Sequence, residues 1–268
     1  MIELNEKDIK IFDMQSSKGN QLKWENDQHW YKADYIGYEG LSEYVVSELL
    51  KYSSLKDNEY VLYKTEQIKY RNQMFKGCVS QNFLEQGVRL ITLERLFQLN
   101  GIQLYQTLYK FDNLVDRVSY LVNETIKFTG LKDFGKYMTK MMAMDALFLN
   151  EDRHMHNIAV LVNQNDEYML CPYFDYGASL LSDITIDYPM DGDLIEYISH
   201  SKSKTVCSNF YEQLEVFENL YGVQISFNFD KNVIKKILEN DINYSDEIKQ
   251  RVFDILMIQI SKYQYLFK

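Results

Sequence analysis

The most informative stretch of this chain is Asn150-Glu151-Asp152-Arg153-His154-Met155-His156-Asn157, followed downstream by Phe174-Asp175-Tyr176-Gly177. Asp152 stands where the chain leaves a long apolar helix, and Asn157 comes five positions later. Two short apolar runs joined by a polar turn then lead to Asp175, and this pattern predicts a β-hairpin. Because Asn157 enters the hairpin and Asp175 lies beyond its exit, we expect both side chains to converge on one spot.

These polar residues carry complementary chemistry. Asp152 is placed to accept the proton of a substrate hydroxyl. The amide oxygen of Asn157 and the carboxylate of Asp175 are the hard oxygen ligands that Mg²⁺ prefers, and Gly177 lets the backbone turn sharply away. Each residue alone is typical of a polar loop. The joint pattern indicates phosphoryl transfer, in which positioning and charge stabilisation carry most of the catalysis.

Length and composition describe an ordinary folded protein. The chain has 268 residues, of which 46% are hydrophobic and 25% charged, enough for one large domain or two lobes that share a cleft. Three widely spaced cysteines argue against a disulfide framework and exclude a four-cysteine zinc site. A net charge of -10 disfavours direct nucleic-acid binding. No apolar run approaches the roughly 20 residues that span a bilayer, and the acidic start lacks a signal peptide. We therefore expect a cytoplasmic protein, or an effector secreted by a route these residues do not show.

Periodicity predicts an α+β fold in two lobes. Residues 9–38 are typical of short antiparallel strands, and 60–63 and 88–92 are also strand-like. Between them, Ser42 is expected to cap a helix. The chain from Leu93 onward is mostly helical apart from the hairpin. We assign residues 1–95 to a β-rich N-lobe and 96–268 to a helical C-lobe. Helices are predicted at 102–112, 113–127, 133–149, 208–221, 230–240 and 245–266.

The N-lobe offers candidates for holding a nucleotide. Lys32 lies on a predicted strand, where a lysine can meet phosphates, and Glu43 or Glu48 on the following helix would hold it. A strand lysine is otherwise a solvated surface residue. The turn 16–19, with Ser17 and Gly19, could hold phosphate oxygens through backbone N–H groups, although by itself it is a hairpin turn.

Two further segments could either belong to the site or have a purely structural role. Residues 92–96, with Glu94 and Leu96, lie where strands give way to helices and would offer backbone groups to an adenine ring; a helix capped by Thr92 fits equally well. Arg153 and His154 could contact metal or phosphate. A zinc site at His154 and His156 is disfavoured because no third soft ligand lies nearby, and His154 is expected to hold the loop through hydrogen bonds.

The catalytic-loop residues 150–157 resemble those of HipA-like serine/threonine kinases and, more distantly, phosphatidylinositol kinases. Residues 17–23, 30–32, 41–43 and 93–96 resemble the family's phosphate loop, lysine strand, glutamate helix and hinge, in that order. The chain lacks room for an extra N-terminal subdomain, so it resembles the compact members, such as a secreted Helicobacter kinase. Leu96 in the hinge and Tyr176 in the metal motif depart from the family pattern without removing a catalytic group.

The resemblance implies a bilobal protein-kinase-like fold and the phosphorylation of Ser or Thr in a protein substrate, with ATP and Mg²⁺. Asp152 would be the base, Asn157 and Asp175 the metal ligands, and Lys32 the phosphate contact. Autophosphorylation in the Ser-containing loop and an antitoxin partner are further family properties. Two alternatives stay open: a nucleotide-binding pseudokinase that acts through contacts, and a lipid or small-molecule kinase. The tail, residues 190–268, is expected to determine substrate choice.

Overall fold

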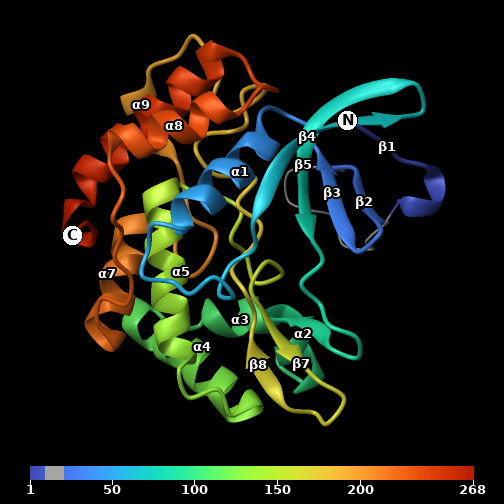
Figure 1. Cartoon of the computed structure of the whole chain (residues 1–268). Helices are drawn as coiled ribbons and strands as arrows, with labels where there is room; N and C mark the ends of the chain where they lie inside the picture. The colour runs from blue at the N-terminus through green and yellow to red at the C-terminus, as the bar shows by residue number, and fades with distance from the viewer. Residues whose placement is uncertain (10–20) are drawn as a thin grey trace.

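A computed structural model describes residues 1–9 and 21–268 of the chain. Its first part is a curled five-stranded sheet in the order β1-β4-β5-β3-β2 (Figure 1). β1 runs parallel to β4, and the other pairs are antiparallel. Two-residue turns with positive φ close the β2–β3 and β4–β5 hairpins, at Asp27-Gln28 and Arg71-Asn72. The strands are β1 (Ile2–Glu3), β2 (Lys23–Asn26), β3 (His29–Ala33), β4 (Tyr63–Tyr70) and β5 (Gln73–Gln81), with a short 3-10 helix η1 (Glu6–Asp8).

Helix α1 (Glu39–Leu50) packs against β4 and β5. It begins three residues before the predicted cap, so the assignment of Ser42 as the N-cap was wrong. The reason is Glu39, whose carboxylate accepts hydrogen bonds from the backbone N–H groups of Ile36 (2.9 Å) and Gly37 (3.1 Å) ahead of the helix. Ser42 lies inside the helix and donates to the carbonyl of Ser179 at 2.8 Å, which attaches α1 to the segment after the Asp175 turn.

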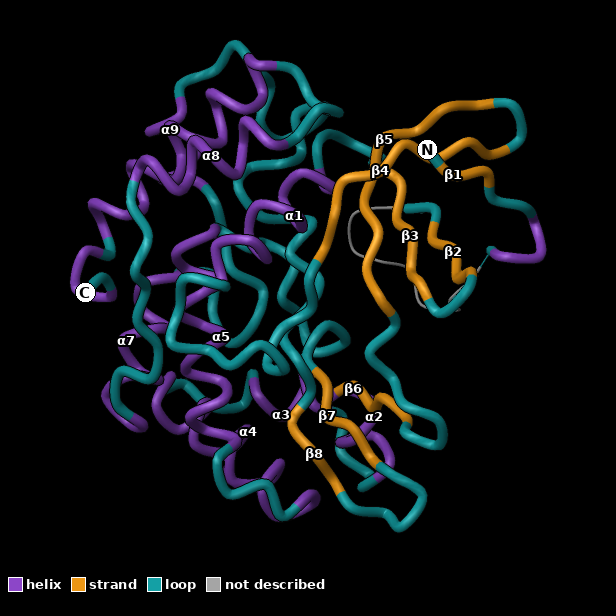
Figure 2. The backbone as a smooth tube through the Cα atoms, in the orientation of Figure 1, coloured by secondary structure: helices purple, strands orange, loops and turns teal. Residues whose placement is uncertain are grey.

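The second part is mostly helical, with one small sheet in the order β6-β7-β8 (Figure 2). Its antiparallel β7–β8 pair confirms the predicted hairpin. A short α6 is an addition to the predicted set, and α2 is the helix capped by Thr92 that the sequence offered as one alternative for residues 92–96. The elements are β6 (Arg89–Thr92), α2 (Leu93–Leu99), α3 (Leu104–Leu108), α4 (Leu114–Thr129), α5 (Phe134–Phe148), β7 (Ala159–Val162), β8 (Tyr168–Leu170), α6 (Leu194–His200), α7 (Phe210–Tyr221), α8 (Lys231–Asn240), α9 (Asp246–Lys262) and η2 (Gln264–Leu266).

One large hydrophobic core joins α1 to the helical part. The buried α5 lies at its centre and contacts α4, α7 and α9, and its C-terminal end delivers the chain to residue 150. A separate small cluster around Trp24 and Ile68 fills one face of the large sheet. The predicted division at residues 95 and 96 falls inside α2, whereas the large sheet ends at Gln81. Within the described residues, none of the helices combines the length and apolarity that crossing a bilayer would take.

Candidate active site

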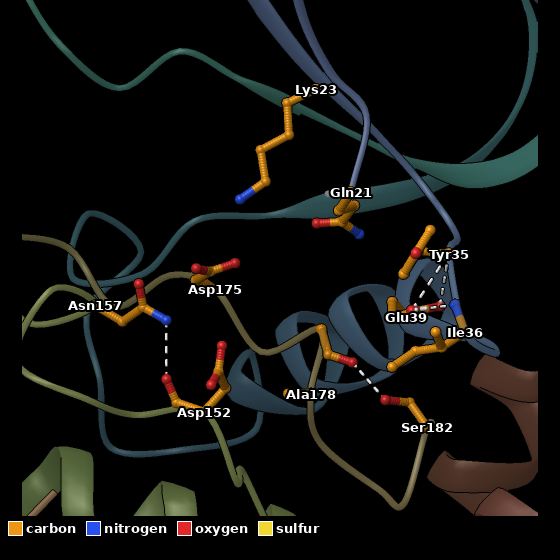
Figure 3. A pocket seen from close by; sticks show the side chains of 11 residues that line it. Gln21, Lys23, Tyr35, Ile36, Glu39, Asp152, Asn157, Asp175, Ala178 and Ser182 are labelled. Carbon is orange, nitrogen blue, oxygen red and sulfur yellow. Dashed lines mark hydrogen bonds between the residues drawn. The ribbon is translucent and has the colours of Figure 1, made fainter. Parts of the chain in front are cut away.

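A pocket lies between β2, the start of α1 and the loop segments 152–157 and 175–182 (Figure 3). The predicted base Asp152 and the predicted metal ligands Asn157 and Asp175 all line it, although they come from two separate segments. Across the pocket from them, Lys23 extends from β2. The full lining is Gln21, Lys23, Tyr35, Ile36, Glu39, Asp152, Asn157, Asp175, Gly177, Ala178 and Ser182.

A buried ion pair shapes the loop that carries Asp152. Helix α5 ends at Leu149, whose φ of 55° turns the chain out of the helix, and the Asn150 N–H donates to the Asp145 carbonyl at 2.9 Å. The Asp145 carboxylate then pairs with Arg153, with 3.1 Å between Oδ2 and Nε, and both side chains are almost wholly buried. Arg153 is therefore not the metal or phosphate contact that the sequence allowed, because Asp145 holds its guanidinium inside the protein.

Arg153 also explains why the two halves of the site converge. Its Nη1 donates to the carbonyl of Asn157 at 3.1 Å and to that of Phe174 at 2.9 Å. Its guanidinium lies over the ring of Tyr176, 4.7 Å from the centroid. A single planar cation with several fixed donors thus holds the end of the loop and the residue before Asp175 in one arrangement.

Asn157 and Asp175 present their oxygens to the pocket. The Asn157 side-chain amide donates to the Asp152 carbonyl at 2.8 Å, which directs the Asn157 amide oxygen the other way (Figure 3). Asp175 has a φ of 66°, in the left-handed region that a non-glycine residue seldom adopts. Such backbone strain persists where the surroundings impose it and is concentrated at functional sites.

Lys32 lies between two carboxylates. Its Nζ is 2.5 Å from Glu43 Oε1 and 2.6 Å from Asp175 Oδ1. Of the two predicted partners, Glu43 is the one that pairs, while Glu48 pairs with Lys51 on the surface. The second Glu43 oxygen accepts the Tyr176 N–H at 2.8 Å, so α1 is bonded directly to the Asp175 turn.

The electrostatics of this triad follow from burial and charge. Burial raises the pKa of Asp175, but Lys32 and then Lys23 outweigh it, so the pKa lies far below its usual value and the carboxylate is ionised. Burial raises the pKa of Glu43 and the positive charge of Lys32 opposes that rise. For Lys32, burial lowers the pKa, but the two carboxylates raise it well above its usual value. The site therefore holds a charged lysine beside an ionised aspartate.

The two histidines do not form a metal site. The His156 N–H donates to His154 Nδ1 at 3.3 Å, and His154 Nε2 is 3.8 Å from Asp152 Oδ2. Burial lowers the pKa of His154 despite the nearby carboxylate. Among the residues that the structure describes, no group of three or more His, Cys, Asp or Glu side chains could hold a metal ion.

Segment 92–96 does not contribute to the lining of the pocket. Thr92 caps α2 by accepting from the Arg95 N–H at 3.2 Å, and Leu96 is buried in the core. The Glu94 N–H donates to the Met155 carbonyl at 3.2 Å, so this segment braces the loop that carries Asp152. The adenine contacts expected at Glu94 and Leu96 stay predictions. The chain passes between the two sheets at residues 82–88.

The connector 82–88 carries an aromatic residue, Phe83, that packs near the start of the Asp175 turn. The ring of Phe83 packs against Phe174, with centroids 5.7 Å apart, and both contact apolar clusters of the two sheets. The predicted phosphate-loop residues Ser17 and Gly19 lie outside the described residues.

Sequence reasoning missed Asp145 and Lys204. Asp145 is the lone acid in the apolar run of α5, and an isolated charge there signals a buried partner. Lys204 lies in the segment after α6, and its Nζ is 3.3 Å from Asp152 Oδ1. No local pattern connects residue 204 with residue 152, so this contact depends on the tertiary structure.

Comparisons with known proteins establish the fold. No protein-family model matches the chain, and no curated protein matches it. Among solved structures, the chain is similar to the Helicobacter pylori proinflammatory kinase CtkA, with a TM-score of 0.62, 20% identity, and coverage of 97% of this chain and 94% of that one. It is also similar to HipA from a Shewanella oneidensis MR-1 toxin–antitoxin complex with HipB and operator DNA. There the TM-score is 0.51 at 11% identity, over 89% of this chain and 59% of that one.

These neighbours confirm the predicted bilobal, kinase-like α+β fold. The pocket that collects Asp152, Asn157 and Asp175 lies where residues of β2 and α1 face the loops that carry these three residues (Figure 3).

Proposed function

We propose that the chain is an ATP- and Mg²⁺-dependent protein kinase that phosphorylates Ser or Thr hydroxyls. One observation carries this proposal. The Nζ of Lys32 is 2.6 Å from Asp175 Oδ1, and Asp175 lines the same pocket as Asp152 and Asn157. Phosphoryl transfer needs a cation for the phosphates, oxygen ligands for a divalent ion and a carboxylate that accepts a proton. Asp152, Asn157 and Asp175 in the pocket, together with Lys32 beside Asp175, would supply these groups.

The residues would act as follows. The substrate hydroxyl gives its proton to the Asp152 carboxylate while its oxygen forms a bond to the γ-phosphorus of ATP. The bond from that phosphorus to the β,γ-bridging oxygen breaks, and ADP leaves with the electron pair. Lys32, held by Glu43, would meet the phosphates nearer the nucleoside as a point charge. The Asp145–Arg153 pair would keep Asp152 and Asn157 in position throughout.

The donor set fits Mg²⁺. Asn157 directs a neutral oxygen into the pocket because its amide nitrogen is bonded to the Asp152 carbonyl, and Asp175 is ionised. Oxygen ligands of this kind suit a hard cation that keeps several waters and phosphate oxygens in its shell. Bound there, Mg²⁺ would neutralise charge on the phosphates.

The test is transfer of label from γ-labelled ATP with Mg²⁺ to the protein itself or to lysate proteins. We expect wild type to label protein, and Asp152→Asn to lose at least a hundredfold of the rate while keeping nucleotide affinity, because only proton acceptance is removed. Mass spectrometry of the products would identify the hydroxyls and show whether Ser17 is among them. Nucleotide binding without any labelled protein would favour the pseudokinase, and label recovered only in lipid or small molecules would favour that alternative.

A second, more specific proposal concerns a protein partner of this chain. The Shewanella HipA structure contains HipB, and we propose an antitoxin-like protein partner for this chain as well. Affinity purification of the tagged chain from its own cells, followed by mass spectrometry, tests this. Recovery of the chain without a stoichiometric partner would contradict it.

A further inference from the structure

A lysine distant in sequence reaches the proposed base. Lys204 Nζ lies 3.3 Å from Asp152 Oδ1, in an ion pair across 52 residues of sequence. The Lys204 side chain is 39% exposed, whereas that of Asp152 is 14% exposed. The more exposed Lys204 side chain therefore reaches the carboxylate from the surface of the protein.

The backbone that carries Lys204 is fixed on both sides. The Thr205 hydroxyl donates to the Arg153 carbonyl at 2.7 Å, and the Lys202 N–H donates to Glu151 Oε1 at 2.9 Å. Ser203 and Thr205 are buried, while Lys204 between them is exposed. The segment 202–205 is thus bonded to the two residues that flank Asp152. A surface lysine without a role needs no such anchoring, and a fixed Cα with a mobile side chain suits a cation that changes partners.

The catalytic loop itself provides no mobile cation at this point. Its arginine, Arg153, is buried and paired with Asp145. Lys32 is held between Glu43 and Asp175. The charge that builds up on a transferring phosphoryl group is stabilised by cations fixed near it, and removing such a cation costs large factors in rate. Lys23 lies across the pocket, and Lys204 is the lysine that pairs with Asp152 itself.

We propose that Lys204 is a catalytic residue that contacts the γ-phosphate. This rests on the proposed function of the pocket. Without nucleotide, Lys204 pairs with Asp152. When the triphosphate binds, the ammonium moves from Asp152 Oδ1 to the γ-phosphate oxygens, which frees that carboxylate oxygen to accept the hydroxyl proton. The lysine forms no covalent bond and keeps its charge throughout.

The experiment compares full-length wild type with Lys204→Met, which keeps most of the aliphatic stem and removes the charge. The matched control is Lys132→Met, at an exposed lysine that precedes the N-terminal end of α5, the end away from Asp152. Calorimetry with Mg²⁺ measures the affinity for ADP and for a non-hydrolysable ATP analogue. Labelled ATP measures turnover. Circular dichroism and melting temperature check that each variant folds.

We expect Lys204→Met to bind ADP as wild type does, to bind the triphosphate analogue roughly tenfold more weakly, and to lose at least tenfold in turnover. Lys132→Met should match wild type in every measurement. An unchanged preference for triphosphate over diphosphate in Lys204→Met would overturn the inference, and so would faster turnover, which would make Lys204 an inhibitory cap.

The two proposals fail in different ways. If wild type transfers label but Lys204→Met equals it, the kinase stands and the role of Lys204 falls. If wild type transfers no label, yet Lys204→Met alone loses the triphosphate preference, Lys204 is a phosphate contact in a nucleotide-binding protein and the kinase proposal falls. Absence of nucleotide binding by wild type would overturn both.

Discussion

At the scale of single residues, the triad Lys32–Glu43–Asp175 shows how the site is organised before any ligand arrives. Glu43 is buried and bonds both Lys32 and the Tyr176 N–H, so it connects the strand, the helix and the turn. Three charged groups share this space, and the one positive charge compensates two carboxylates. Removing it leaves partly buried negative charge without a partner, which is strongly unfavourable.

We expect Lys32→Met to lower the free energy of unfolding by ~3–5 kcal/mol, because Glu43 and Asp175 then repel each other in the interior. Adding Glu43→Gln should restore part of this loss by removing one charge. Urea unfolding of the single and double variants measures both effects. Lys64→Met, an exposed change on β4, serves as the control. Equal stability of Lys32→Met and wild type would show that the triad is not a charge-compensated unit.

Activity gives a second readout of the same residue. Lys32→Met should weaken ATP binding or turnover at least tenfold, about 1.4 kcal/mol. Assays belong well below the melting temperature of the variant, so that loss of fold is not counted as loss of function. Full activity of folded Lys32→Met would remove this lysine from the phosphate site.

At the scale of elements, α5 and the loop after it act as one unit. The helix would otherwise present Asp145 to an apolar core, and Arg153 returns to pair with it. Burial lowers the pKa of Arg153, but the negative charge of Asp145 outweighs this and raises it, so the guanidinium stays charged. The ion pair thereby determines the path of the loop.

We expect Asp145→Asn to destabilise the protein by ~3–5 kcal/mol, because the Arg153 charge is left buried and unpaired while the side-chain shape is kept. Amide hydrogen exchange over residues 150–157 should accelerate more than over β4. Asp133→Asn, at the exposed start of α5, is the control and should change stability by about 0.5 kcal/mol or less. Wild-type protection of the loop in Asp145→Asn would show that other contacts hold it.

Element boundaries show where local sequence suffices. The hairpin β7–β8 follows from two apolar runs around a polar turn, and the helices α7, α8 and α9 begin with Asn209, Asp230 and Ser245 as side-chain caps. The start of α1 differs because Glu39, three residues before Ser42, is drawn to the N–H groups of the preceding loop. Whether α1 begins at Glu39 or near Ser42 therefore depends on the path of the loop that precedes the helix.

At the scale of the whole molecule, the α8–α9 connection fastens the helical part to the large sheet. The Tyr244 hydroxyl donates to Asp34 Oδ2 at 2.7 Å, and the Gly40 N–H donates to Asp34 Oδ1 at 2.7 Å. Thr65 on β4 donates to Asp241 at 2.6 Å. Burial, and then the neighbouring negative charge of Glu39, raise the pKa of Asp34 to about 7.

This shift predicts a pH dependence of stability. In the unfolded chain an aspartate titrates near 3.9, so between about pH 4 and 7 the folded protein holds a proton on Asp34 that the unfolded chain releases. The contribution of Asp34 to the free energy of unfolding is fully present below about pH 4. It decreases by roughly 1 kcal/mol per pH unit as the pH rises from there, and it is lost once the pH has passed through about 7.

Asp34→Asn removes that titration and keeps the size of the side chain. We therefore expect the variant to gain stability relative to wild type as pH rises from 5 to 8, measured by melting temperature at each pH. Asp112→Asn, at an exposed position, should show no such trend. A constant difference between Asp34→Asn and wild type would show that Asp34 is ionised across the range.

Local sequence was enough to predict the α+β composition, the hairpin, and Asp152, Asn157, Asp175 and Lys32 as candidate site residues. These predictions follow from hydrophobic periodicity and from residue types at fixed short spacings, which are local properties. The placement of adenine contacts at Glu94 and Leu96 stays a prediction, because a strand-to-helix junction has the same local pattern whether it faces a ligand or braces a neighbouring loop.

Only the tertiary structure decided that Arg153 is buried on Asp145, that Glu43 and not Glu48 holds Lys32, and that Lys204 reaches Asp152. Each of these choices depends on distances between segments that are far apart along the chain. Long charged side chains accept several partners of similar energy, so the packing of α1, α5 and the segment after α6 selects which partner lies within reach.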